Sequence, residues 1–231
     1  MTFLPEDSLE TLNQLAHIPV GNALLEGELH LPEEAAGVVV FANSSRHSPR
    51  NQAIAEEIAE AGLGTLLVDL LTPEEQKRAT VTGVRRFDIE LLAKRLTGVV
   101  RWLERHPHTR ALETGFAASG TGTAAAIMAA VELDGRISAI VSRGGRPDLA
   151  GEALYKVRAP TLLIVGGNDD VLVDINQEAY EHMRWRRDLR ILPGASHLFK
   201  EAGKLKQVAQ LNAAWFMRYM GSAVRKESWS R

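Results

Sequence analysis

The fold is decided by the stretch ETGFAASGTGTAAA, residues 113–126. Its first half is a short β-like run, and its second half is a series of small residues typical of a helix start. A strand that turns sharply into a helix exposes the side chain at the turn at one edge of a sheet. Ser119 lies at this junction, so its hydroxyl is a candidate nucleophile and the backbone N–H of Gly120 a candidate oxyanion donor. The competing interpretation is that Ser119 only caps the helix.

The rest of the chain predicts an α/β fold with a mostly parallel sheet and helices on both faces, which makes three layers. Short Val/Ile/Leu runs alternate with amphipathic stretches, the pattern typical of βαβ units. After an antiparallel edge strand near Leu24–Leu31, the expected strands are Gly37–Ala42, Gly64–Asp69, Glu113–Ala118, Ile137–Ser142, Thr161–Gly166 and Leu189–Leu192. The expected helices are Pro49–Ala61, Val84–Arg105, Gly120–Leu133, Asp174–Arg184 and Gly203–Met220.

Length and composition favour one domain. A chain of 231 residues with 45% hydrophobic content can bury one sizeable core, so residues 1–231 are expected to form a single α/β domain with a loose tail at about 222–231. The interval between Val141 and Val157 is too short for a separate lid domain. We therefore expect any site to be open.

The charge pattern and the missing residue types exclude several classes of function. The net charge is −2 and the basic residues are scattered, which argues against nucleic acid as a partner. There is no apolar run of membrane-spanning length and no signal-like segment at Met1–Asp7, so we expect a cytoplasmic protein with no membrane contact. Cysteine is absent and the histidines lack metal-ligand spacing, so no metal is expected. A small molecule is the expected partner, and a homodimer is left open.

Two later segments supply candidate partners for the serine. The apolar strand at Thr161–Gly166 is followed by Asp169, the candidate acid, with Asp170 as the alternative. The last expected strand leads through a Pro-Gly turn to His197, the candidate general base. Taken singly, a carboxylate here is as well explained by helix capping or a solvated turn, and a histidine by a loop contact with backbone.

The conjunction of the three favours chemistry, because each residue follows a separate expected strand, in the chain order Ser, Asp, His. At this point the chain resembles the α/β-hydrolase superfamily, in particular its small, lidless dienelactone-hydrolase-like members. The pieces that carry the resemblance are SSRHSPRN at 44–51, GGND at 166–169 and PGASHLF at 193–199. The resemblance implies a serine hydrolase of the esterase or lactonase type, without metal or organic cofactor, in which Ser119 is the nucleophile, Asp169 the acid and His197 the base.

The chain departs from this family pattern in two places. The turn usually reads G-x-S-x-G, whereas here Ala117 and Thr121 take the glycine positions and Gly122 comes one place late. Members also usually carry a His-Gly loop after the first parallel strand, whose N–H completes the oxyanion hole. This chain is shorter there, and the backbone N–H of Asn43 is the expected substitute. The alternative interpretation is a catalytically impaired member of the fold with a binding or assembly role.

Two arginines are expected at the same edge of the sheet. Arg46 follows the first parallel strand and Arg143 follows the strand ending at Ser142. A guanidinium suits a carboxylate or phosphate, so both are candidate anchors for an anionic group on a small ester or lactone. The structural alternative, in which an arginine ties loops together, is equally compatible with the sequence.

Overall fold

The computed structural model describes residues 11–42, 46–82 and 88–220. The strands are β1 (Leu12–Val20), β2 (Ala23–Leu31), β3 (Gly37–Ala42), β4 (Gly64–Val68), β5 (Glu113–Gly120), β6 (Ile137–Gly145), β7 (Thr161–Gly166) and β8 (Arg187–Leu192). The helices are α1 (Pro49–Glu60), α2 (Pro73–Thr82), α3 (Ile89–Leu103), α4 (Gly122–Glu132), α5 (Ala153–Lys156), α6 (Asp170–His182) and α7 (Lys204–Met220), with a 3₁₀ turn η2 at Pro147–Ala150.

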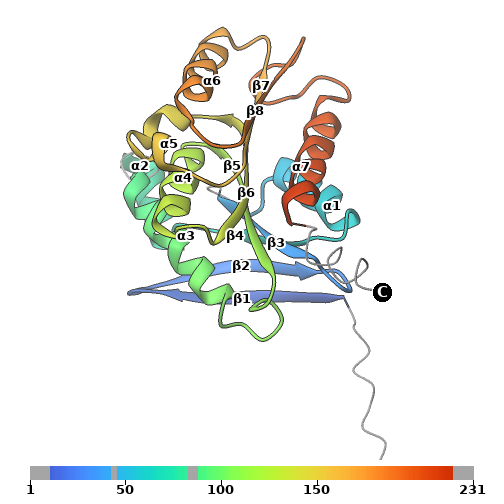
Figure 1. Cartoon of the computed structure of the whole chain (residues 1–231). Helices are drawn as coiled ribbons and strands as arrows, with labels where there is room; N and C mark the ends of the chain where they lie inside the picture. The colour runs from blue at the N-terminus through green and yellow to red at the C-terminus, as the bar shows by residue number, and fades with distance from the viewer. Residues whose placement is uncertain (1–10, 43–45, 83–87, 221–231) are drawn as a thin grey trace, which may run out of the picture.

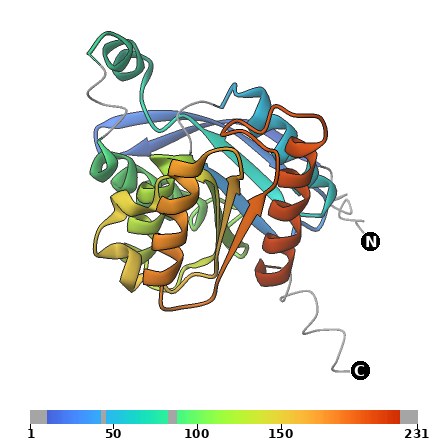
Figure 2. The ribbon, with the colours of Figure 1, turned by 90° about the horizontal axis from the view of Figure 1, so that it is seen from above.

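The strands form one sheet in the order β1-β2-β4-β3-β5-β6-β7-β8. The pairs β1/β2 and β2/β4 are antiparallel, and every later pair is parallel. Figures 1 and 2 show α3, α4, α5 and α6 on one face of this sheet and α1 and α7 on the other. The fold is therefore the expected three-layer α/β arrangement of α/β hydrolases.

Each face of the sheet buries its own apolar core. Phe116 of β5 and Leu96 of α3 belong to the core beneath α3 and α4. Phe41 of β3 and Phe216 of α7 belong to the core beneath α1 and α7. The central strands β3, β4 and β7 are buried along their whole length, which is why they read as continuous apolar runs.

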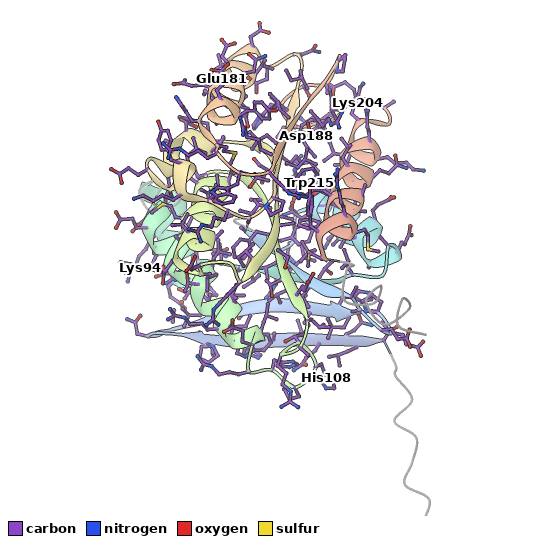
Figure 3. All side chains as sticks on the ribbon, viewed as in Figure 1. Lys94, His108, Glu181, Asp188, Lys204 and Trp215 are labelled. Carbon is purple, nitrogen blue, oxygen red and sulfur yellow. The ribbon has the colours of Figure 1, made fainter. Side chains whose placement is uncertain are left out.

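The helix α7 is held to the sheet by an indole as well as by apolar packing. Figure 3 shows Trp215 pointing from α7 toward the sheet, whereas Lys94 of α3 points to solvent on the opposite side. The Nε1–H of Trp215 donates to the carbonyl oxygen of Pro160 at 3.2 Å, just before β7. Among the residues that the structure describes, no helix combines the length and apolar character needed to cross a membrane.

The structure corrects the sequence prediction in several elements. The strand β1 was not predicted, because only Ala16 and Ile18 of its nine residues are buried. The helix α2 was also missed, since it is acidic and polar in its first turn and has no apolar stripe. The helix α6 begins at Asp170, four residues before the expected Asp174. The segments 84–87 and 222–231, expected as helix start and tail, lie outside the described residues.

Parallel pairing brings the candidate residues to one edge. The strands β3, β5, β6, β7 and β8 end on the same side, because all five run in the same direction. Ser119 pairs with Arg143 in the sheet register, and Arg143 in turn pairs with Ile164 of β7. Open α/β sheets place their ligands at this carboxyl edge.

Candidate active site

The turn from β5 to α4 positions Ser119 at the rim of the sheet. The strand continues through Ser119 to Gly120, and the helix begins at Gly122 after the single residue Thr121. Alternate residues of a strand face the same side, and Ala117 lies in the core beneath α1 and α7. Ser119 therefore faces the α1/α7 side. Gly120 has a φ of +53°, a left-handed conformation that glycine adopts without steric cost.

An aspartate and a histidine meet next to this turn. The Nδ1 atom of His197 lies 3.2 Å from Oδ2 of Asp169. The second oxygen of the same carboxylate, Oδ1, accepts a hydrogen bond from the backbone N–H of Leu172 at 3.2 Å and so caps α6. Capping and contact with histidine are thus compatible, because they use different oxygens. Asp170, the alternative acid, is the exposed first residue of α6.

The loop that carries His197 is held by backbone contacts. The N–H of Asn168 donates to the carbonyl oxygen of Ala195 at 2.9 Å, and the N–H of Ser196 donates to Oε2 of Glu201 at 3.0 Å. Gly144, with a φ of +52°, lies against the imidazole: a Cβ there would be 3.4 Å from both Cε1 and Nδ1 of His197. The ring is therefore fixed on two sides while its side chain stays half exposed. This leaves Nε2 as the nitrogen available to a substrate.

A cavity of about 140 Å³ opens between the turn and the histidine loop. Its described lining comes from four parts of the chain: Arg50, Ser119, Gly120, Arg143, Gly144, His197, Leu198 and Phe199. Ser119 is the only hydroxyl-bearing side chain in that lining. The volume suits a small molecule, since sites for drug-sized ligands are at least about twice as large.

Arg143 places in this cavity a cation that has few hydrogen-bond partners among the described residues. Its Nη2 donates to Oδ1 of the buried Asn51 at 3.0 Å. Its Nη1 is buried and has no hydrogen-bond partner among the described residues. Burial, and secondarily the nearby charge of Arg50, lowers the pKa of Arg143 to about 10, so it is still cationic at neutral pH. An anionic group in the cavity would relieve both the burial of this charge and its repulsion with Arg50.

Arg50 was missed by the sequence interpretation. It lies in the first turn of α1, directly after Pro49, and that turn contains no acidic residue. A cation at a helix N-terminus interacts unfavourably with the helix dipole. Its presence there despite this cost could have indicated that Arg50 has a functional role.

The structure does not bring Arg46 to the cavity. Its guanidinium Nη2 lies 2.9 Å from Oε2 of Glu26, and its Nε lies 3.5 Å from carboxylate oxygens of Glu28 and Asp69. Its backbone N–H also donates to Asp69 at 3.0 Å. Arg46 thus ties the start of the β3–α1 loop to β2 and the end of β4, which is the structural alternative.

The remaining expectations concern oxyanion donors and metals. The N–H of Gly120 belongs to a residue that lines the cavity, whereas Asn43 lies outside the described residues. Within residues 11–42, 46–82 and 88–220, no group of three or more His, Asp or Glu side chains is arranged to hold a metal ion.

Comparison with known proteins finds relatives that match most of this chain. A dienelactone hydrolase from Anabaena variabilis is 46% identical, over 91% of this chain and 99% of its own, with a TM-score of 0.88. A dienelactone hydrolase-like promiscuous phosphotriesterase from metagenomic libraries is 16% identical, over 91% of this chain and 99% of its own, with a TM-score of 0.74, which shows likeness of fold alone. No protein-family profile matches the chain.

A curated relative is considerably longer than this chain. A Mycobacterium tuberculosis protein with the provisional name phosphoribosyl transferase is 48% identical over 207 residues, which make up 88% of this chain and 46% of that protein. The chain thus spans about half the length of the curated relatives that it matches.

Proposed function

Because the chain belongs to the dienelactone-hydrolase-like family of α/β hydrolases, we propose that its cavity hydrolyses a small ester or lactone that carries an anionic group. The observation that carries the proposal is the contact between His197 and Asp169 at 3.2 Å, beside a cavity whose lining includes Ser119. A carboxylate that fixes an imidazole next to a hydroxyl is the arrangement that serine hydrolysis requires.

In the proposed reaction, Ser119 attacks the carbonyl carbon while His197 takes the hydroxyl proton. The tetrahedral intermediate then expels the alcohol oxygen, which leaves with that proton, and an acyl-Ser119 remains. A water molecule, deprotonated by His197, attacks the acyl group and releases the acid and the free serine. Asp169 holds the imidazole in the tautomer that keeps Nε2 available and stabilises the imidazolium.

Arg143 and Arg50 support the anionic character of the substrate. Both line the cavity, and the buried Nη1 of Arg143 has no hydrogen-bond partner in residues 11–42, 46–82 and 88–220. A carboxylate on the substrate would accept from this guanidinium and hold the ester group toward Ser119.

Covalent labelling tests the proposed function. Wild type and Ser119→Ala are incubated with a fluorophosphonate probe, and the labelled protein is quantified. We expect labelling of the wild type that is lost in Ser119→Ala and in His197→Gln. Hydrolysis is then compared for two esters of equal size, one with a carboxylate and one with a carboxamide. Absence of label from folded wild type, together with no turnover of either ester, would contradict the proposal.

A second candidate function is ligand binding without hydrolysis, favoured by one observation. The residue in the left-handed conformation at the turn is Gly120, which has no nucleophilic side chain. In that case the cavity would bind the carboxylate-bearing compounds without labelling or turnover, as isothermal titration calorimetry would show.

A further inference from the structure

The turn between β5 and α4 has its apex at residue 120. Ser119 pairs with Arg143 in the sheet, and after a register shift Gly120, the last residue of β5, pairs with Gly145. Gly120 has a φ of +53°, and Thr121 already has helical backbone angles, with φ −66° and ψ −22°. A strand-to-helix turn presents its nucleophile from the sharp, strained position of the turn. In this chain that position is Gly120, one residue after the serine.

The sequence around the turn agrees with this placement. When the pattern G-x-S-x-G is centred on residue 120, it covers ASGTG at 118–122, and its final glycine falls on Gly122. When it is centred on Ser119, it covers AASGT at 117–121, and neither glycine is matched. With residue 120 as the centre, the next backbone N–H belongs to Thr121 at the start of α4. There the helix dipole favours developing negative charge.

The structure also has room for a side chain at the apex. A Cβ built on Gly120 meets no atom within 4 Å, unlike a Cβ on Gly144, which meets the His197 backbone and ring at 3.3–3.4 Å. Gly120 lines the same cavity as His197 and Arg143. A Cβ at this position would therefore displace no neighbouring residue, although the positive φ strains any side chain there, and a serine at 120 would belong to the cavity that His197 also lines.

We infer that residue 120 is the best-placed nucleophile position of this turn, that the native glycine leaves it without a side chain, and that Ser119 of the proposed reaction acts from the less favourable position next to it. The inference rests on the proposed function only in taking His197 as the base, and it does not depend on reaction at Ser119. The variant Gly120→Ser would then carry a hydroxyl better placed than that of Ser119. With a fluorophosphonate, its Oγ would form a bond to phosphorus, His197 would take the hydroxyl proton, and fluoride would leave.

Four proteins test the inference: wild type, Ser119→Ala, Gly120→Ser and the double variant Ser119→Ala/Gly120→Ser. Each is treated with the fluorophosphonate, digested with trypsin and analysed by tandem mass spectrometry of the peptide 111–136, which contains both positions and no internal Lys or Arg. Gly135→Ser is the matched control, because Gly135 also has a positive φ and open space. It reports the effect of a serine in a left-handed turn away from the cavity.

We expect the double variant to be labelled at residue 120, at least about tenfold faster than wild type is labelled anywhere, since a positioned general base contributes roughly 10²–10⁴-fold. Label at Ser119 of the wild type, lost in Ser119→Ala, tests the proposed function separately. A folded double variant without label at residue 120 would overturn the inference.

The absence of native cysteine provides a second measurement. Gly120→Cys and Ser119→Cys each contain one thiol, whose alkylation by iodoacetamide is followed against pH. We expect the thiol at 120 to react at lower pH than the thiol at 119, and this difference to disappear when His197 is replaced by Gln. Equal pH profiles at the two positions would count against the inference. So would failure of every position-120 variant to fold while Gly135→Ser folds, because the apex would then not accept a side chain.

Discussion

The placement of Arg143 favours binding of an anionic ligand but lowers the stability of the fold. Its Nη1 is buried without a hydrogen-bond partner among the described residues, and burial depresses its pKa to about 10. A buried cation that lacks full pairing destabilises the folded state relative to an apolar side chain of similar volume. Such an arrangement is typical of sites where function opposes stability.

Arg143→Met is therefore expected to separate stability from binding. The free energy of unfolding should stay within about 1 kcal/mol of wild type or rise, because the desolvated charge is removed. Affinity for a carboxylate-bearing ester should fall at least about tenfold, while affinity for its carboxamide analogue should change little. Chemical denaturation and titration calorimetry measure the two effects. Arg190→Met, at an exposed pair with Asp188, is the control. Equal loss of both ligands would contradict the anchoring role.

The pKa of Arg143 also predicts an alkaline limit to anion binding. In the unfolded chain this guanidinium keeps its usual, higher pKa, and burial in the folded state lowers that pKa to about 10. The folded state therefore bears the penalty of the buried charge below about pH 10, and the penalty is relieved as pH rises above about 10 toward the higher pKa of the unfolded chain. A bound anion needs the charged form, so affinity should fall as pH rises through about 10. Titrations between pH 8 and 11 check this, with Arg143→Met expected to be insensitive to pH in that range.

At the scale of elements, Asp169 links the start of α6 to the site. Its Oδ1 caps the helix through Leu172, and its Oδ2 contacts His197. The sequence prediction started this helix at Asp174, although helix capping was one of the roles left open for Asp169. Because Asp169 both caps α6 and contacts His197, the position of the helix start and the orientation of the imidazole depend on each other.

Substitution of Asp169 should distinguish these two contributions. Asparagine caps helices about as well as aspartate, so Asp169→Asn should cost less than about 0.5 kcal/mol of stability. It should lower the labelling rate by roughly 10²–10⁴-fold, because an amide does not hold the same histidine tautomer. Asp169→Ala should add the loss of the cap, about 1 kcal/mol. Thermal unfolding and labelling rates measure both; an Asp169→Asn protein with wild-type rates would remove Asp169 from the mechanism.

The sequence predicted the central elements better than the peripheral ones. Strands such as Thr161–Gly166 are buried on both faces, so their apolar runs identify them directly. The edge strand β1 buries little and α2 has a polar sequence, so their patterns are weak. At the site, strand order identified Asp169 and His197 as neighbours. The left-handed apex at Gly120 is a property of backbone geometry, which the degenerate motif did not specify.

At the scale of the whole molecule, the site depends on two separate cores. The cavity draws its residues from α1, the β5 turn, the end of β6 and the loop before α7. Arg50 lies in α1 and the His197 loop leads into α7, and these two helices share one core, whereas the β5 turn continues into α4 on the other. The alignment of the site thus requires both helical layers to be packed on the sheet.

Phe216→Ala tests this dependence. Phe216 of α7 is fully buried in the core that α1 and α7 share, so its truncation should lower the free energy of unfolding by about 3–5 kcal/mol. If the molecule unfolds as one cooperative unit, tryptophan fluorescence and far-UV circular dichroism should give the same shifted midpoint. Loss of labelling should then coincide with that transition. Two separate transitions would show that the α1/α7 layer unfolds independently of the other.

The open, left-handed position at Gly120 also has an evolutionary consequence. A glycine codon that ends in a pyrimidine becomes a serine codon by one base change, and no atom lies within 4 Å of where the new Cβ would be. A single point mutation can therefore remove or restore a hydroxyl at this turn and leave the rest of the cavity unchanged. Sequence relatedness alone would then not show which related proteins hydrolyse a substrate and which only bind it.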